Sequence, residues 1–263
     1  MDTYSALRVD RREEIVDITM TRPDLMNRFD STLETELACV LEDVAADDSA
    51  RVVTLLSEGK VFSAGGDFDL MLACNDDIGP RHVALQRARR LMSAIVDLPV
   101  PFVVGVQGAA IGLGATIAAG SDVVVASRNA KIADTHVAVG LAAGDGGALF
   151  LPQAMGMLRA RRYLLTGDSM DAKTAFDFGL VTDLVDTPDD VAPTVRGIAD
   201  RIAALPPLGV RGTKVALNQV TRQRAGEVAE TALMWEGVTL ASADLVEAIS
   251  AFKEKRSGKY EGR

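Results

Sequence analysis

Apolar and polar positions along the chain alternate between strand-like and helix-like spacing. Residues 6–10 and 15–20 alternate with period two, which predicts two strands joined by a hairpin at 10–14. Apolar residues from Leu33 to Val44 have helical spacing, so we expect a helix that is capped by Asp30 or Ser31 and runs to about Ala46. Further strands are predicted at 51–56, 101–106, 122–126 and 180–185, and further helices at 80–97, 112–119, 147–155, 158–165 and 171–178. This rhythm predicts an α/β fold with largely parallel strands.

The pattern becomes mostly helical from about residue 188. We expect helices at 189–204, 207–223 and 228–255, with the proline pair at 206–207 as the best boundary. The chain therefore divides into a core, 1–204, and a helical C-terminal region, 205–263. The arginines of the predicted helix 80–97, including Arg87, are expected to form a solvated face.

Length, composition and charge limit the classes of protein that fit. The 263 residues, 48% of them hydrophobic and 25% charged, indicate a globular chain with a sizeable core. A net charge of −9 argues against a nucleic-acid binder. The sequence gives no signal peptide and no membrane span. Cys39 and Cys74 suggest neither a metal site nor a disulfide framework, so a cytoplasmic location is expected.

Two glycine-rich turns carry the candidate chemistry. Residues 61–68 and 106–115 each follow a strand-like apolar run and lead into a possible helix, where unpaired N–H groups can face a developing oxyanion. The second turn lacks the third glycine of a dinucleotide fingerprint, and no P-loop lysine follows either turn. The chain contains no Gly-x-Ser-x-Gly and no His-Glu-x-x-His motif, which argues against a serine hydrolase or a zinc hydrolase.

Six segments in order resemble the crotonase (enoyl-CoA hydratase/isomerase) superfamily over nearly the whole chain. They are residues 21–27, 61–67, 101–114, 164–168, 172–185 and 251–256. The resemblance implies a spiral of repeated ββα units followed by a helical C-terminal trimerisation region. It also implies an acyl-CoA thioester as partner, coenzyme A as part of the substrate, no tightly bound cofactor, and a homotrimer or homohexamer.

The resemblance assigns the backbone N–H groups of Gly66 and Leu113 to an oxyanion hole that stabilises a thioester enolate. Many relatives carry glycine in place of Leu113, whose side chain is expected to narrow the pocket. Phe252 and Lys255 match residues that reach the nucleotide of a neighbouring subunit. The other residues matching coenzyme A contacts are Asp24, Leu25, Met26, Ser63, Ala64, Asp67, Phe68 and Asp69.

The acid/base groups depart from the family pattern. Where typical hydratases carry two glutamates, this chain has Thr116 and His136. His136 is either catalytic or a structural histidine bonded to a carboxylate such as Asp134, and Asp145 is either catalytic or a helix cap. Two hypotheses follow. The first is an enzyme that acts on an acyl-CoA, as an enoyl-CoA hydratase, an isomerase or a catalyst of another crotonase reaction. The second is a non-catalytic acyl-CoA binder that lost the acid/base pair.

Overall fold

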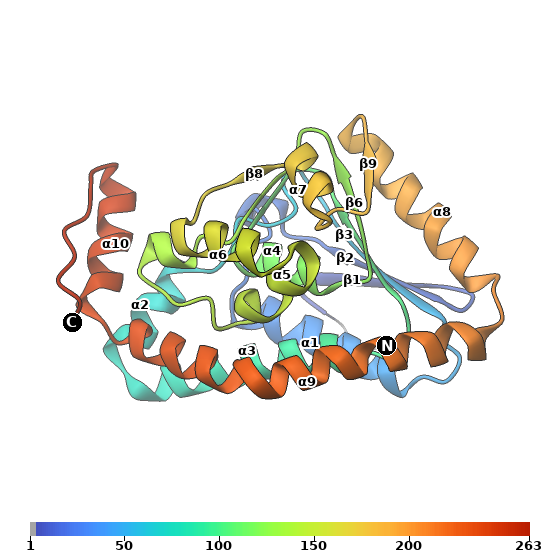
Figure 1. Ribbon diagram of the computed structural model, residues 1–263, viewed down its shortest axis with the longest axis horizontal. Helices are drawn as coiled ribbons and strands as arrows, with labels where there is room; N and C mark the ends of the chain where they lie inside the picture. Colours follow the sequence, from blue (N-terminus) through green and yellow to red (C-terminus); the bar gives the residue numbers. More distant parts are fainter. Residues whose placement is uncertain (1–3) are drawn as a thin grey trace.

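A six-stranded sheet forms the centre of the protein in a computed structural model that describes residues 4–263 (Figure 1). Its strand order is β1-β2-β3-β4-β6-β9. The hairpin of β1 and β2 is antiparallel and every other pair is parallel. The strands are Leu7–Arg12, Ile15–Met20, Val52–Ser57, Phe102–Val106, Val123–Ser127 and Asp183–Val185. The predicted α/β fold with largely parallel strands is confirmed.

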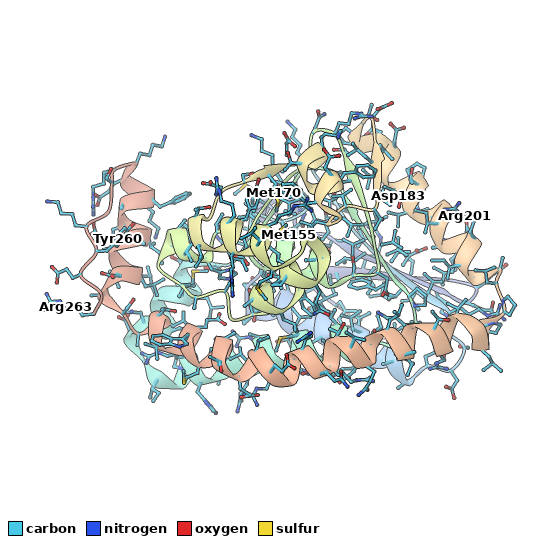
Figure 2. The ribbon with its side chains drawn as sticks, viewed as in Figure 1. Met155, Met170, Asp183, Arg201, Tyr260 and Arg263 are labelled. Atoms are coloured by element: carbon cyan, nitrogen blue, oxygen red, sulfur yellow. The ribbon has the colours of Figure 1, made fainter. Side chains whose placement is uncertain are left out.

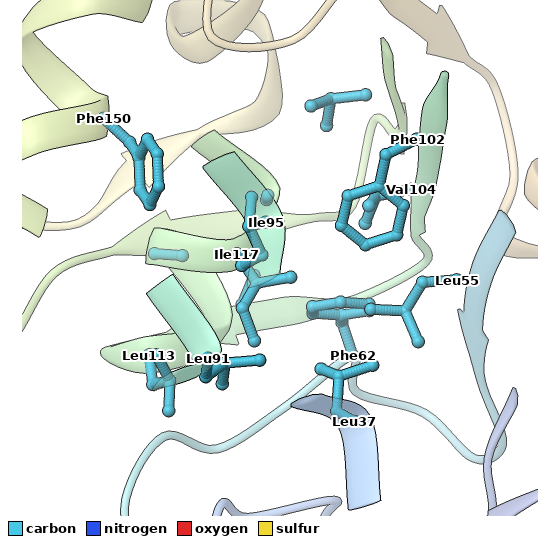
Figure 3. Close-up of a cluster of buried hydrophobic side chains, with 14 of the residues drawn as sticks. Leu37, Leu55, Phe62, Leu91, Ile95, Phe102, Val104, Leu113, Ile117 and Phe150 are labelled. Atoms are coloured by element: carbon cyan, nitrogen blue, oxygen red, sulfur yellow. The ribbon is translucent and has the colours of Figure 1, made fainter. Parts of the chain in front are cut away.

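Both faces of this sheet are covered by helices, which explains why its central strands are almost continuously apolar. All five residues of β4 are buried. On one face, Val52, Val103 and Val125 pack with Val191 and Val195 of α8 (Val191–Ala203). The opposite face packs in the main core against α1 (Ser31–Ala46) and α3 (Ile78–Asp97), and Figure 3 shows part of that core. As predicted, Asp30 caps α1 by accepting from the amides of Thr32 and Leu33.

A second, three-stranded sheet pairs short strands that the sequence pattern did not reveal. It consists of β5 (Ala109–Ile111), β7 (Lys131–Ala133) and β8 (Met170–Asp171), in the order β5-β7-β8. Strands of two or three residues are too short for a period to be recognised. The remaining helices of this region are α2 (Phe68–Asp76), α4 (Leu113–Gly120), α5 (Gly147–Met155), α6 (Met157–Thr166) and α7 (Ala172–Phe178), with 3-10 turns at Pro23–Leu25, His136–Val139 and Pro188–Asp190.

The C-terminal region differs from the prediction in where its helix breaks. A single helix, α9 (Pro207–Leu240), runs along the length of the molecule, and α10 (Ala243–Glu254) follows it (Figure 1). The predicted break at 224–227 is wrong, because one glycine, Gly226, costs a helix only about 1 kcal/mol. The true break lies at Ala241–Ser242, where the Ser242 hydroxyl accepts from the Leu245 amide and caps α10.

The last residues of the chain return along α10, and Figure 2 shows Tyr260 and Arg263 beside that helix. The amides of Glu261 and Gly262 donate to the Asp244 carboxylate at the start of α10. The Ala243 amide donates to the Arg263 carbonyl. Among residues 4–263, no helix combines the length and the apolar character needed to cross a membrane.

Candidate active site

The two glycine-rich turns lie side by side. Ser63 joins them, because its amide donates to the Ala109 carbonyl and its carbonyl accepts from the Ile111 amide, both at 3.0 Å. Gly65 (φ +92°) and Gly112 (φ +53°) have backbone conformations that other residues rarely adopt. A Cβ atom added to Gly112 would lie 3.6 Å from the Gly65 Cα atom, so the two backbones approach closely.

Two unpaired amides from these turns line one small cavity of about 70 Å³. Leu113 is the first residue of α4, so its N–H has no partner within the helix. Gly66 lies in a bridge to Phe29, but the bonds of that bridge use the Gly65 carbonyl and the Asp67 amide. Over residues 4–263 neither the Gly66 nor the Leu113 N–H donates to a protein group.

Apolar and ionisable side chains share the wall of this cavity. The buried side chain of Leu113 belongs to it, as the sequence indicated for a leucine in that place, and Figure 3 shows Leu113 at the margin of the buried apolar cluster. Other apolar lining comes from Leu70, Met71, Leu141 and Leu240. The ionisable groups on the cavity are Glu34, Asp67, Cys74, His136, Asp145 and Glu236.

His136 is buried between two carboxylates. Its Nδ1 lies 2.7 Å from Asp134 Oδ1, and its Nε2 lies 3.1 Å from Asp145 Oδ2. Burial alone would lower the pKa of His136, but the charges and hydrogen bonds of Asp145 and Asp134 outweigh it, so this pKa is well above its usual value. The raised pKa favours the imidazolium, which donates from both nitrogens, and the contact with Asp134 expected of a structural histidine is present.

Asp145 is held by side chains from both positions where typical hydratases carry glutamates. His136 contacts its Oδ2, and the Thr116 hydroxyl donates to its Oδ1 at 3.3 Å. Burial would raise the pKa of Asp145, but the His136 charge outweighs it, so this pKa lies below its usual value. The N-cap residue of α5 is Gly146, which has no side chain to cap the helix. The amide of Gly147, the first residue of α5, donates to the Asp145 carboxylate, so Asp145 contacts the start of this helix as well as lining the cavity.

Two further carboxyls reach the same cavity from distant helices. Glu34 of α1 pairs with Arg87 of α3 at 3.1 Å, so Arg87 is not part of a solvated face as predicted. Burial raises the pKa of Glu34 to about 7 despite Arg87. Glu236 of α9 is 9% exposed, and within residues 4–263 its Oε2 has no hydrogen-bond partner. Burial together with Asp145 raises its pKa to about 8.

Glu236 is not among the residues predicted from the sequence, although the chain contains a signal for it. Ala229, Leu233, Glu236 and Leu240 recur at intervals of four, three and four residues, and all four are buried. This is the spacing of the apolar face of a helix. A carboxylate at a core position of that face is unusual unless it is paired or functional.

The residues expected to contact coenzyme A form two adjoining loops and one helix end. Asp24, Leu25 and Met26 are exposed on a turn whose Met26 carbonyl accepts from the Ala64 amide. Ser63 differs from the expectation of a lining side chain. It is fully buried, and its hydroxyl donates to the Asn27 carbonyl, so this side chain holds the loop together.

Asp67 is likewise occupied by protein contacts. It caps α2 through the amides of Asp69 and Leu70, and it forms an ion pair with Arg28 at 2.9 Å. Its role is therefore to fix the start of α2 beside the cavity, and Asp69 itself is exposed.

Phe252 of α10 meets Phe68 of α2 within the same chain. Their ring centroids are 5.4 Å apart in an edge-to-face arrangement. This contact joins two predicted contact residues within one chain, and the expectation that Phe252 reaches the nucleotide of a neighbouring subunit stays a prediction. Lys255 ends α10 with φ +54° and is exposed.

Comparisons with known proteins agree with this architecture. The enoyl-CoA hydratase/isomerase family matches residues 10–263. The 1,2-epoxyphenylacetyl-CoA isomerase of Escherichia coli K12 is 30% identical over 253 residues, 95% of each chain. The 2,3-dehydroadipyl-CoA hydratase of the same organism is 30% identical, over 98% of this chain and all of the relative.

A solved structure has the same fold. An enoyl-CoA hydratase/isomerase from Pseudoalteromonas atlantica T6c superposes with a TM-score of 0.88 at 31% identity, covering 98% of this chain and all of that one. Among residues 4–263, no cluster of three or more histidine, cysteine or carboxylate groups is arranged to hold a metal ion. The chain belongs to the enoyl-CoA hydratase/isomerase family of the crotonase superfamily, and is an acyl-CoA-processing enzyme of that family.

Proposed function

We propose that this enzyme moves a carbon–carbon double bond in an enoyl-CoA thioester, as an isomerase and not as a hydratase. The observation that carries the proposal is that Thr116 and His136, at the two positions of the hydratase glutamates, both bind Asp145. Hydration needs groups that position and activate a water molecule. Here those two positions support a single carboxylate instead.

The proposed reaction begins with proton transfer from the substrate to Asp145. The low pKa of Asp145 keeps it ionised at neutral pH, so it can accept a proton from C2 of a 3-enoyl-CoA. The electron pair of the broken C2–H bond moves toward the thioester oxygen. A proton delivered to C4 then leaves the double bond between C2 and C3.

The N–H groups of Gly66 and Leu113 form the proposed oxyanion hole for the thioester oxygen. Neither donates to a group among the described residues, 4–263, and both residues line the cavity that Asp145 also lines. Such a donor typically contributes about 2.7–4 kcal/mol to the stabilisation of the transition state. This contribution offsets the weakness of an aspartate with a lowered pKa as a base.

The proposal also covers coenzyme A binding, cofactors and assembly. Coenzyme A contacts are assigned to the exposed turn at 24–26, the backbone of 63–64, the start of α2 at 67–69, and Phe252 and Lys255. No tightly bound cofactor is required, because each step is a proton transfer. We further propose a cytoplasmic homotrimer or homohexamer in which 205–263 is the assembly region.

The decisive experiment gives the purified protein a 3-enoyl-CoA and, separately, a 2-enoyl-CoA, and follows the absorbance of the conjugated thioester. An isomerase raises the absorbance with the 3-enoyl ester. A hydratase instead lowers it with the 2-enoyl ester, which would overturn the proposal. Absence of change with both, together with acyl-CoA binding in a titration, would indicate another crotonase reaction or a non-catalytic binder.

Asp145→Asn tests the base in the same assay. We expect kcat to fall by about 100- to 10,000-fold, because the amide cannot accept the C2 proton. The affinity for a saturated acyl-CoA, measured by titration, should stay similar. Wild-type turnover in this variant would exclude Asp145 as the base.

A further inference from the structure

Glu236 lines the active-site cavity, and its Oε2 has no hydrogen-bond partner in the described part of the chain. Residues 4–263 supply no hydrogen bond to its buried Oε2, and the residue lines the same cavity as Asp145, Gly66 and Leu113. By contrast, Glu34 on this cavity is paired with Arg87. A buried polar group without a partner is costly unless something else binds it.

The loop that carries Asp145 is attached to the helix that carries Glu236. The Thr239 hydroxyl of α9 accepts from the Ala142 amide at 3.1 Å. A Cβ atom added to Gly144 would lie 2.5 Å from Glu236 Oε2 and 2.6 Å from Glu236 Cβ, so a glycine here leaves room for the carboxyl. The loop and the helix are therefore joined beside the cavity that Asp145 and Glu236 both line.

We infer that Glu236 is a second catalytic residue. It is the acid that delivers a proton to C4 of the substrate, whereas Asp145 removes the proton from C2. This inference rests on the proposed isomerase reaction. Asp145 and Glu236 differ in their partners: the Asp145 carboxylate receives donors from Thr116 and His136, whereas Glu236 Oε2 receives none. The raised pKa of Glu236, about 8, agrees with a protonated carboxyl at neutral pH.

The step balances as two proton transfers. Asp145 takes the proton from C2 of the 3-enoyl-CoA, and the electron pair of that bond delocalises into the thioester as a dienolate. Glu236 gives its proton to C4, where a new C–H bond forms as the double bond settles between C2 and C3. Asp145 then releases its proton to solvent water, and Glu236 takes one from solvent water, which restores the starting state.

The test separates these two transfers by running the reaction in D₂O. The Glu236→Gln variant keeps the size of the side chain but cannot deliver a proton, so we expect isomerisation to fall at least about 100-fold. Exchange of the C2 hydrogen with solvent needs only Asp145 and the two N–H groups, and should stay within a few-fold of wild type. Glu230→Gln, on an exposed part of α9, is the matched control and should change neither rate.

An isomerisation rate in Glu236→Gln equal to that of wild type would overturn the inference. Loss of both the isomerisation and the C2 exchange, in a variant that still binds a saturated acyl-CoA, would also overturn it. If wild type itself neither isomerises the 3-enoyl ester nor exchanges its C2 hydrogen, the proposed function fails instead. A measurement on wild type alone covers the case in which the variant does not fold. With a C2-deuterated substrate in H₂O, two separate carboxyls predict no deuterium at C4 of the product, whereas transfer of deuterium to C4 would indicate that Asp145 alone carries the proton.

Discussion

Hydrogen-bond partners decide the charge of each carboxyl in the active site. Asp145 and Glu236 are both buried, and burial favours the neutral acid in each case. His136 reverses this for Asp145, because an imidazolium lies 3.1 Å from its Oδ2. Glu236 has no comparable donor, so one carboxyl stays ionised and the other stays protonated. Two carboxyls whose pKa values move in opposite directions are the pattern expected of a base and an acid.

The stability of the protein reports the charge of Glu236 independently of activity. Its pKa of about 8 in the folded chain is above the ordinary 4.5, so the stability that its protonated form provides is present below pH 4.5 and is lost as the pH rises through 8. Glu236→Gln removes this loss. The unfolding free energy of the variant relative to that of wild type should therefore increase from pH 5 to pH 9, by on the order of a few kcal/mol.

Urea denaturation of both proteins at the two pH values measures this gain. The groups that face Glu236, namely Asp134, His136, Asp145 and Glu34 with its partner Arg87, are present in both proteins and largely cancel in the comparison. A difference in unfolding free energy that is the same at pH 5 and pH 9 would contradict a protonated Glu236.

The sequence predicts helices and strands well, but it does not predict contacts between residues that are far apart in the chain. The bounds of α1 follow from helical spacing and from the capping residue Asp30, which are local signals. Gly66, Leu113, His136 and Asp145 are singled out by the resemblance to the crotonase superfamily, and their roles stay predictions. Glu236 lies 91 residues beyond Asp145, on a helix without chemical motifs, so only the fold reveals that they share a cavity. The pairing of Arg87 with Glu34 is hidden for the same reason.

At the scale of elements, Gly105 sets how closely α8 packs on the central sheet. A Cβ atom there would lie 2.6 Å from Leu56, 2.8 Å from Val191 and 3.0 Å from Val195, where two of the three neighbours belong to α8. We expect Gly105→Ala to destabilise the protein by about 1–3 kcal/mol through overpacking. Thermal or urea denaturation measures the change.

Gly197 of α8 is the matched control for this prediction. It lies inside the same helix, and a Cβ atom there would meet nothing within 4 Å. Gly197→Ala should therefore stabilise the protein by roughly 0.5–1 kcal/mol, because alanine has the higher helix propensity. A destabilising Gly197→Ala, or a neutral Gly105→Ala, would mean that α8 does not pack on β4 as described.

At the scale of the whole molecule, α9 exposes several large apolar side chains in the single chain. It runs along one side of the molecule (Figure 1), and its exposed large apolar side chains are Leu208, Val215, Leu217, Val220, Met234, Trp235 and Val238. Exposed apolar side chains that gather on one element are typical of an interaction surface. The proposed homo-oligomer gives it a partner, namely another copy of the chain.

Light scattering on the purified protein tests this assembly, and we expect three or six times the mass of one chain. Met234, Trp235 and Val238 cluster at the end of α9, so Val238→Glu should shift the mass toward that of one chain by placing a charge in a buried contact. Trp235 is the only tryptophan and is half exposed in the single chain, so its emission should shift to the red as the oligomer is diluted. Lys173→Glu, at an exposed site on α7, controls for added negative charge and should leave the mass unchanged. A single-chain mass for wild type at every concentration, with constant Trp235 emission, would show that α9 does not join copies of the chain.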